Sequence, residues 1–340
     1  MASKISRRTV VKGVAAVGGA AALGPFFIGR ANAQMKKMVF ITPFKYLAGF
    51  MPVLNADTGG HFAKAGLDAE ILPGNGAAQA VQQVLSGRAA IGRASSIDIV
   101  NAVGNQGAPL ISFSTVKQSS PFFVTSHKDN PIDSPKDMVG KVIGITSSGG
   151  GTENLLDMML EKNGIPHKSV ERQVVGNAAG AFSLIEAGRI ACYMPSTGSV
   201  VNLRETGQPI HAWNTDREVP MPGQIYFCST ETLEKNPEML VSFLRGVRAS
   251  LDEVRNADLK PVLTRIGDKY DLIGIKNLDL LAISAKAELD TWFEEGDANI
   301  LRNVASRWDS ITNAMVSLKL AKPVKASTLY TNKLVDQASA

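Results

Sequence analysis

The stretch VIGITSSGGGTENLLDMMLEKNG, from Val142 to Gly164, contains the pattern on which the fold of this 340-residue chain is built. An apolar run ends at two serines and three glycines, and a segment with apolar residues at helical spacing follows. This order predicts a strand, a tight loop and a helix that is N-capped by Thr152. Glycine costs about 0.5–1 kcal/mol more than alanine in regular structure, so three in a row need an explanation.

The glycine loop, residues 147–152, allows two explanations. It is either a flexible turn, or a cradle in which bare N–H groups, hydroxyls and the positive end of a helix dipole face a ligand. Known phosphate motifs do not fit, because no Gly-Lys-Ser/Thr follows the glycines and Asn154 stands where GxGxxG requires its third glycine. The loop alone does not decide between the two.

Strand-like and helix-like segments alternate on both sides of this stretch. Helices of about ten residues between strands predict βαβ units and mostly parallel sheets that are covered on both faces. From Thr230 onward the pattern is mainly helical. The predicted strands are 38–42, 67–72, 89–94, 109–116, 122–126, 141–146, 171–175, 190–193, 209–213 and 223–229, and the predicted helices between them are 77–85, 98–103, 153–162, 179–187 and 200–205.

Two segments within this alternation are alike. PGNGAAQAVQQVLSGRAAIGRASS (Pro73–Ser96) and VGNAAGAFSLIEAGRIACYMPST (Val175–Thr197) share Gly-Asn, an alanine-rich helix, Gly-Arg, a short strand and small hydroxyl residues. Chance similarity between alanine-rich helices is the alternative explanation. The shared order of these features favours two similar lobes.

The first 33 residues have the features of a cleavable export signal. Arg7 and Arg8 precede an apolar, glycine-rich run, and the sequence Ala-Asn-Ala at 31–33 supplies small residues for cleavage after Ala33, as in the twin-arginine class. Val10 replaces the phenylalanine usual in that motif, which leaves the general secretory route open, and a membrane anchor is a further alternative. Export would place the mature protein in the periplasm.

Charge and composition narrow the choice of partners. Five of the 36 basic residues lie in the export segment, so the remaining chain has 31 basic and 31 acidic residues and no nucleic-acid partner is expected. No later apolar run approaches the ~20 residues that span a bilayer. Cys192 and Cys228 are too few for a disulfide scaffold and lie in apolar strand-like runs, which predicts two buried free thiols.

The segments GLDAEILPGNGAAQAVQQVLSGRAAIGRASSIDIV, SPKDMVGKVIGITSSGGGTENLLDMMLEKNGI and YFCSTETLEKNPEMLVSFLRGV resemble the solute-binding proteins of ABC importers. The nearest group serves sulfonates, nitrate, taurine and pyrimidine (thiamine) precursors. The resemblance runs from about Met38 to Val254 and is loose from about Asn256 onward. It implies an α/β protein with the type II periplasmic binding-protein fold, whose two α/β lobes share a two-strand hinge near 123–126 and 224–227, with a helical C-terminal extension. Lobe one would take residues 35–124 and 225–340, and lobe two residues 127–222.

In such a fold the ligand lies between the lobes, at the carboxyl ends of strands and the amino ends of helices. The resemblance therefore implies ligand contacts from the loop after the first strand, from the two repeated segments, from the cleft edge and from the glycine loop. The expected ligand-binding residues are Phe44, Lys45, Tyr46, Asn75, Gly76, Ser95, Ser96, Gln118, Ser147, Ser148, Gly149, Gly150, Gly151, Thr152, Asn177, Ser196 and Thr197. No catalytic residue, metal ligand or cofactor is expected.

The expected function is capture of a small polar or anionic organic solute, sulfonate- or carboxylate-like, by a monomeric protein that delivers it to an ABC permease and its ATPase. A ligand-sensing protein for a membrane receptor is one alternative, which the sequence does not separate from transport. A thiamine-pyrimidine synthase-like enzyme is the other. It would need clustered His and Cys ligands or a lysine-held cofactor, whereas the four histidines stand apart without HxxxH or HxH spacing.

The export signal gives a first prediction. Replacing both arginines, Arg7→Lys with Arg8→Lys, should leave the uncleaved precursor in the cytoplasm, because the twin-arginine route requires the pair. Immunoblots of fractionated cells would measure precursor and mature protein. Unchanged periplasmic accumulation of the double variant would assign export to the general secretory route.

Overall fold

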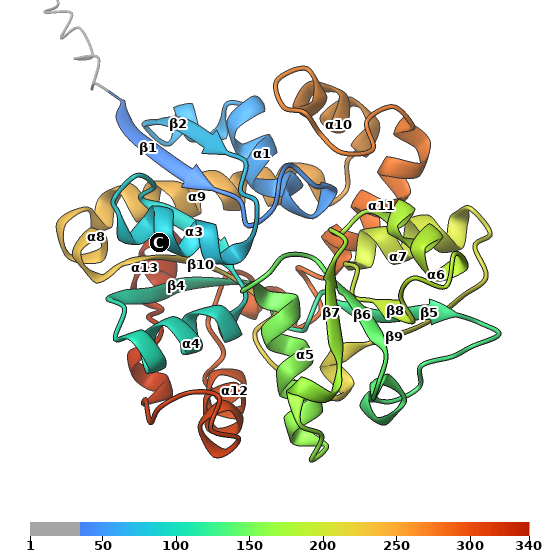
Figure 1. The fold of residues 1–340 in the computed structure, drawn as a ribbon. Coiled ribbons are helices and arrows are strands. Elements are labelled where there is room, and N and C mark those ends of the chain that lie inside the picture. The colour runs from blue at the N-terminus through green and yellow to red at the C-terminus, as the bar shows by residue number, and fades with distance from the viewer. Residues whose placement is uncertain (1–34, 340) are drawn as a thin grey trace, which may run out of the picture. The chain divides into compact units, whose positions relative to one another are not determined.

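The computed structural model describes residues 35–339, so the predicted export signal lies outside the described residues. Within these residues ten strands form two five-stranded sheets, ordered β2-β1-β3-β10-β4 and β7-β6-β8-β5-β9 (Figure 1). The first sheet contains β1 (Lys36–Ile41), β2 (Leu67–Leu72), β3 (Ile91–Ala94), β4 (Leu110–Lys117) and β10 (Gln224–Ser229), and the second contains β5 (Phe123–His127), β6 (Val142–Ile145), β7 (Glu171–Val174), β8 (Cys192–Tyr193) and β9 (Ile210–Asn214).

The central strand β10 of the first sheet is buried along nearly its whole length because helices cover both faces of the sheet. In β10, Ile225 and Phe227 belong to one core cluster, and the alternate residues Tyr226 and Cys228 belong to another. Successive side chains of a strand point to opposite faces, so burial on both faces requires a continuous apolar run rather than an alternating one.

The sheets are mostly parallel, as expected, but one strand of each sheet is antiparallel to the others. β10 is antiparallel to β3 and β4, and β5 is antiparallel to β8 and β9. Each reversed strand is the first to follow a crossing from the other sheet: residues 118–122 lead from β4 into β5, and residues 215–223 lead from β9 into β10.

The helices form layers on the two faces of each sheet. Apolar residues of α1 and α9 pack with Met38 and Phe40 in one cluster, and apolar residues of α3, α4, α5 and α12 share the other. The helices are α1 (Met51–Thr58), α2 (His61–Lys64), α3 (Ala77–Leu85), α4 (Ser96–Gln106), α5 (Gly151–Lys162), α6 (Ser183–Glu186), α7 (Thr197–Glu205), α8 (Thr230–Lys235), α9 (Pro237–Val254), α10 (Leu259–Gly267), α11 (Leu278–Asp290), α12 (Ala305–Ser317) and α13 (Lys333–Ser339). Short 3-10 helices are η1 (Ala48–Phe50), η2 (Pro135–Met138), η3 (His167–Ser169), η4 (Ala179–Phe182), η5 (Thr215–Arg217), η6 (Asp297–Asn299) and η7 (Ala326–Thr328).

Two local predictions need correction. The helix after the glycine loop begins at Gly151 with Gly150 as its N-cap, so Thr152 is not the cap; its Oγ1 accepts a hydrogen bond from the Thr146 N–H at 2.9 Å. The helix predicted over 179–187 is instead η4 followed by the single turn α6. Both differences occur at glycine-containing segments. Glycine allows α5 to begin at Gly151, and the small residues of η4 allow the tighter 3-10 conformation.

Other predictions agree with the structure. The helix predicted over 77–85 has those bounds as α3, and Cys192 and Cys228 are both buried free thiols. Among residues 35–339, no helix combines the length and hydropathy that a membrane crossing requires.

The crossing segments contain a glycine whose replacement tests how tightly they pack. A Cβ on Gly223 would lie 1.7 Å from the carbonyl oxygen of Ser119 in the other crossing segment. Gly223→Ala should therefore lower the free energy of unfolding by about 1–3 kcal/mol, as overpacking does. Urea denaturation would measure the change.

The matched control is Gly180→Ala in η4, where a Cβ would meet nothing within 4 Å. This variant should be neutral or slightly stabilised. Equal stability of the two variants would contradict the packing argument.

Candidate functional site

A cavity of about 70 Å³ lies between the two sheets, and residues that follow strands of both sheets line it. Its lining combines phenylalanine rings, hydroxyls and four ionisable side chains. The lining residues are Pro43, Phe44, Leu47, Gly49, Phe50, Gly76, Ala77, Arg93, Ser95, Asp98, Lys117, Pro121, Phe122, Thr146, Ser147, Gly151, Thr152, Asn177, Ser196, Gln224 and Glu288.

Arg93, in β3, is the most unusual of these residues because it is only 2% exposed. Its Nε donates to Gln224 Oε1 at 3.1 Å and one terminal nitrogen donates to the Gly49 carbonyl at 3.0 Å. Its guanidinium lies 4.6 Å from the centre of the Phe50 ring. Within residues 35–339 no carboxylate forms an ion pair with it, and burial lowers its pKa. The cavity thus presents a positive charge held by neutral groups and an aromatic face.

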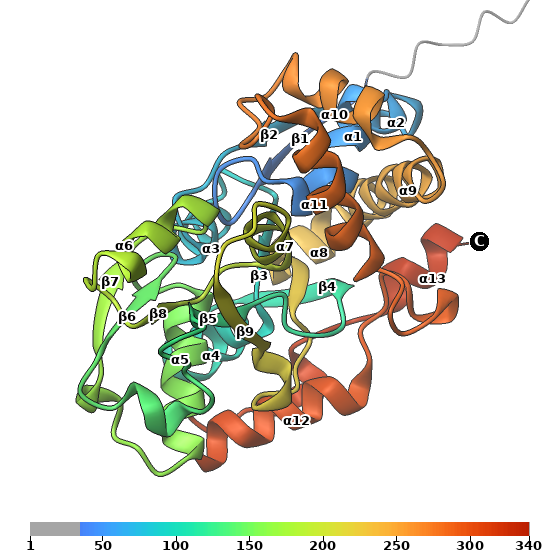
Figure 2. The ribbon, with the colours of Figure 1, turned by 90° about the vertical axis from the view of Figure 1, so that its right-hand side faces the viewer.

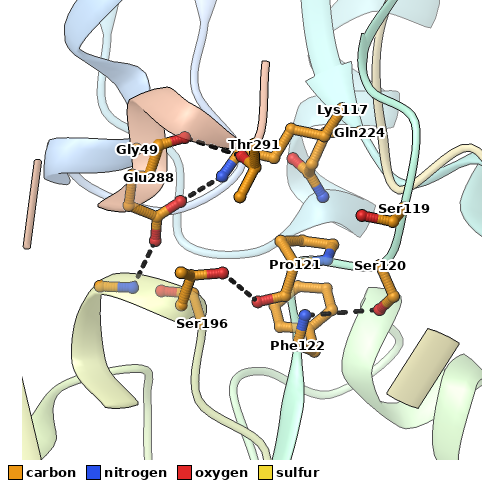
Figure 3. Close-up of polar contacts among 12 residues, drawn as sticks. Gly49, Lys117, Ser119, Ser120, Pro121, Phe122, Ser196, Gln224, Glu288 and Thr291 are labelled. Carbon is orange, nitrogen blue, oxygen red and sulfur yellow. Dashed lines mark hydrogen bonds and ion pairs between the residues drawn. The ribbon is translucent and has the colours of Figure 1, made fainter. Parts of the chain in front are cut away.

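Lys117 and Glu288 form a buried ion pair (Figure 3). Arg93 lies close enough to this pair to affect the pKa of both residues. Lys117 ends β4, and Glu288 lies in α11. Burial lowers the pKa of Lys117, which Glu288 only partly offsets. Burial alone would raise the pKa of Glu288, but Lys117, the Gly198 N–H and Arg93 together outweigh it, so the pKa of Glu288 is below its ordinary value. In the ionised pair the two charges cancel.

Asp98 joins the two sheets across the cavity. It lies in the first turn of α4, where its Oδ2 accepts from the Ser95 N–H at 3.0 Å and Ser95 Oγ accepts from the Ile97 N–H, which together form a capping box. Its Oδ1 accepts from the Asn154 side chain of α5 at 2.9 Å. Burial raises the pKa of Asp98 to about 6, against the lowering effect of these hydrogen bonds.

These charges can be summed. Arg93 and Lys117 carry two positive charges, Glu288 carries one negative charge, and Asp98 titrates near pH 6. Below pH 6 the cavity has one uncompensated positive charge, and a bound anion would favour this protonated form of Asp98. Above about pH 6 ionised Asp98 would offset this charge, so an anionic ligand is favoured most when Asp98 is protonated.

The structure brings eight of the seventeen predicted ligand-binding residues to the cavity. These are Phe44, Gly76, Ser95, Ser147, Gly151, Thr152, Asn177 and Ser196. The other nine do not line it: Lys45, Tyr46, Asn75, Ser96, Gln118, Ser148, Gly149, Gly150 and Thr197.

Several residues of the second group are engaged elsewhere. Lys45 is exposed, and the Tyr46 hydroxyl donates to the Ile71 carbonyl. The Gln118 side chain donates to the carbonyls of Asn299 and Arg302, away from the cavity. Thr197 bonds the Pro121 carbonyl. Local position next to a strand end thus placed these residues near the site without aiming their side chains into it.

The glycine loop acts mainly as a contact between the lobes. The Gly149 N–H donates to Glu153 Oε2 at 2.5 Å, so a carboxylate of the helix itself already occupies that donor. A Cβ on Gly151 would lie 3.2 Å from Asp98 Oδ2, and one on Gly76, across the cleft, would lie 2.8 Å from Ser147 Oγ. Glycine at these positions lets the loop approach α3 and α4 closely, which is one physical reason for the run of glycines.

The sequence analysis missed Arg93, Lys117, Asp98, Gln224 and Glu288. Arg93 and Lys117 stand inside or at the end of strongly apolar strands, and a charge in such a strand is a signal that could have been used. Glu288 lies on a helix with many exposed charges, so nothing in its sequence context distinguishes it.

The cysteines do not fit a nucleophilic role. Burial raises the pKa of Cys192 and of Cys228 to about 12, so neither is a thiolate at neutral pH. Neither of them lines the cavity.

Comparisons with known proteins agree with this architecture. A sequence model of the family described as NMT1/THI5 like matches residues 48–257, more than half of the chain. The formylaminopyrimidine-binding protein of Halalkalibacterium halodurans is 28% identical over 194 residues, which cover 55% of this chain and 57% of that protein. The match therefore spans little more than half of the relative's length.

Two solved structures are similar over nearly their whole length. A protein of Bordetella bronchiseptica RB50 superimposes with a TM-score of 0.72 at 20% identity, covering 90% of this chain and 98% of its own. The periplasmic aliphatic sulphonate-binding protein of Escherichia coli gives a TM-score of 0.63 at 14% identity, covering 86% and 97%. At these identities the likeness concerns the fold, and it confirms the expected periplasmic binding-protein fold.

Asp98 gives a prediction for pH dependence. A carboxyl whose pKa is raised on folding binds its proton more tightly in the folded state, so its contribution to stability is most favourable below its unfolded pKa near 3.8 and is lost as pH rises to about 6. Two pH units correspond to about 3 kcal/mol. Asp98→Asn should therefore gain stability relative to the original protein between pH 4 and 6.

Chemical denaturation at several pH values would measure the difference in free energy of unfolding between the two proteins. Altered hydrogen bonding would change this difference by the same amount at every pH, so it would not affect the predicted change with pH. A pH-independent difference between the two proteins would contradict the raised pKa.

Proposed function

The chain belongs to the NMT1/THI5-like family, and we propose that it is the solute-binding component of an ABC-type importer. In this proposal the exported protein acts in the periplasm, encloses a small polar or anionic organic solute between two lobes and delivers it to a permease with its ATPase. The lobes are residues 35–124 with 225–340, and residues 127–222. They would move about the paired crossings that lead into β5 and β10.

The observation that carries the proposal is Arg93. A guanidinium that is 2% exposed and has only neutral hydrogen-bond acceptors is costly unless an anion joins it. The geometry leaves the cavity beside it, between the sheets, so a solute carboxylate or sulfonate would supply the missing charge.

The comparisons do not select one solute. The E. coli neighbour is named for aliphatic sulphonates and the H. halodurans relative for formylaminopyrimidine. Phe44, Phe50 and Phe122 line the same cavity, so an apolar or aromatic solute body would find rings to pack against. We propose a monoanion whose organic part meets these rings.

A thermal-shift screen with sulfonates, carboxylates, nitrate and pyrimidines would identify the solute. Ligand at one hundred times its dissociation constant stabilises the fold by about 2.7 kcal/mol. Stabilisation by neutral pyrimidines, with no response to any of the anions, would overturn the proposed class of solute.

Arg93→Gln should weaken binding of the anion found in this screen by roughly ten- to a hundredfold or more, because a hydrogen bond to a charged group contributes about 1.5–3 kcal/mol. Calorimetry would measure the affinity, and a melt without ligand would check the fold. Arg88→Gln is the control, since Arg88 is exposed on the turn after α3. Unchanged affinity in a folded Arg93→Gln protein would contradict the role of Arg93.

A further inference from the structure

Helix α11 reaches across from the first sheet's side of the molecule to the second. It follows β10 in the chain and packs against α10 and η1, yet it also packs against α7, which follows β8 of the second sheet (Figure 2). Ser196 is the N-cap of α7, and the first turn of that helix faces α11. A single helix therefore contacts both sides of the cleft.

Glu288 makes this contact through its carboxylate, with one oxygen for each side. Oε2 forms the ion pair with Lys117 of β4, and Oε1 accepts a hydrogen bond from the Gly198 N–H of α7 at 2.7 Å (Figure 3). The residue is 4% exposed. An anion at the positive end of α7 is where the helix dipole favours it. The protein thus places its own carboxylate where a solute anion could bridge the lobes.

Two glycines make room for this carboxylate. A Cβ on Gly49 would lie 3.1 Å from Glu288 Oε2, and a Cβ on Gly198 would lie 3.1 Å from Oε1. A Cβ at either position would lie closer to the carboxylate than most Cβ contacts allow, so the carboxylate would have to shift slightly. The fit is therefore close on both sides of the cleft.

Glu288 also stands between two cavities. A second cavity, of about 150 Å³, shares Leu47, Gly49, Asn177, Ser196 and Glu288 with the inner one. Its far side is formed by Gly274, Asn277 and Ala178, which are exposed. Glu288 is thus one of five residues that lie between the two cavities, and the only one of the five with an ionisable side chain.

We propose that Glu288 is a latch that holds the two lobes closed in the absence of solute and separates the inner cavity from the outer one. Release of the Gly198 N–H frees the lobes while Glu288 remains paired with Lys117 in lobe one. The inference rests on the proposed clamp motion, but not on the identity of the solute. The hydrogen bond between Asp98 and Asn154 also crosses the cleft, so loss of the latch shifts the balance toward an open form without abolishing closure.

The test measures the distance between the lobes in solute-free protein. Nitroxide labels at Arg88→Cys and Arg189→Cys occupy equivalent turns after α3 and after α6, both exposed. The two natural cysteines are buried, so the labels attach selectively. Pulsed electron–electron double resonance measures the distance between the two labels. In the labelled protein that keeps Glu288, it should give mainly one short distance. Glu288→Ala should raise the population of longer distances roughly ten- to a hundredfold, the range expected for a charge-assisted hydrogen bond.

Matched variants separate the latch from general damage. Asp290→Asn removes an exposed carboxylate two residues along α11 and should leave the distances unchanged. Glu288→Gln keeps an acceptor for Gly198 but loses the charge, so it should open less than Glu288→Ala. Gly198→Ala crowds the carboxylate from the other lobe, leaves the pair with Lys117 in place, and should also open the protein.

The outcomes are distinct from those of the solute experiments. Identical distance distributions for Glu288→Ala, Gly198→Ala and the unchanged chain would overturn the latch, even if Arg93 binds a solute anion. If Glu288→Ala does not fold, Gly198→Ala alone decides the result. Opening in both variants supports the latch whether or not a solute has been found.

Discussion

Among residues 35–339, the ionisable side chains of Arg93, Lys117 and Glu288 are buried in the seam between the two sheets, and much of the surrounding structure is arranged to hold them. Arg93 is bound by Gln224 and the Gly49 carbonyl and rests on Phe50. Lys117 and Glu288 satisfy one another. An unpaired buried charge costs far more than an apolar residue. The C-terminal helices therefore have a role beyond packing, since α11 supplies the carboxylate that balances Lys117.

The fold was largely predictable because strand-like segments alternate regularly with segments of helical periodicity. Residues 67–72 and 77–85 have the predicted type and bounds, since turns rich in glycine mark their ends. Strand direction was not predictable in the same way. The reversal of β5 and β10 depends on where the chain crosses between sheets, and an apolar run looks the same in either direction.

The site was predictable only where it follows strand ends. Ser95, Asn177 and Ser196 line the cavity because each lies in a loop that follows a parallel strand. The carboxyl ends of parallel strands lie at the same edge of a sheet. Side-chain direction within those loops is set by tertiary hydrogen bonds, so Gln118 and Tyr46 point elsewhere. The role of Glu288 could not be predicted for another reason. It comes 171 residues after its partner Lys117, and no local sequence pattern links the two residues.

The glycine loop lines the cavity through Ser147, Gly151 and Thr152 and also brings the two sides of the cavity close together. Its glycines permit backbone of one lobe to lie against Asp98 and Gly76 of the other, and Gly49 and Gly198 do the same around Glu288. Close approach of the lobes is thus built into four separate glycine positions. Residues 48–257 match the family, and Glu288 lies beyond them. The carboxylate that joins the two sheets at Gly198 is therefore supplied by a helix outside the segment that the family model matches.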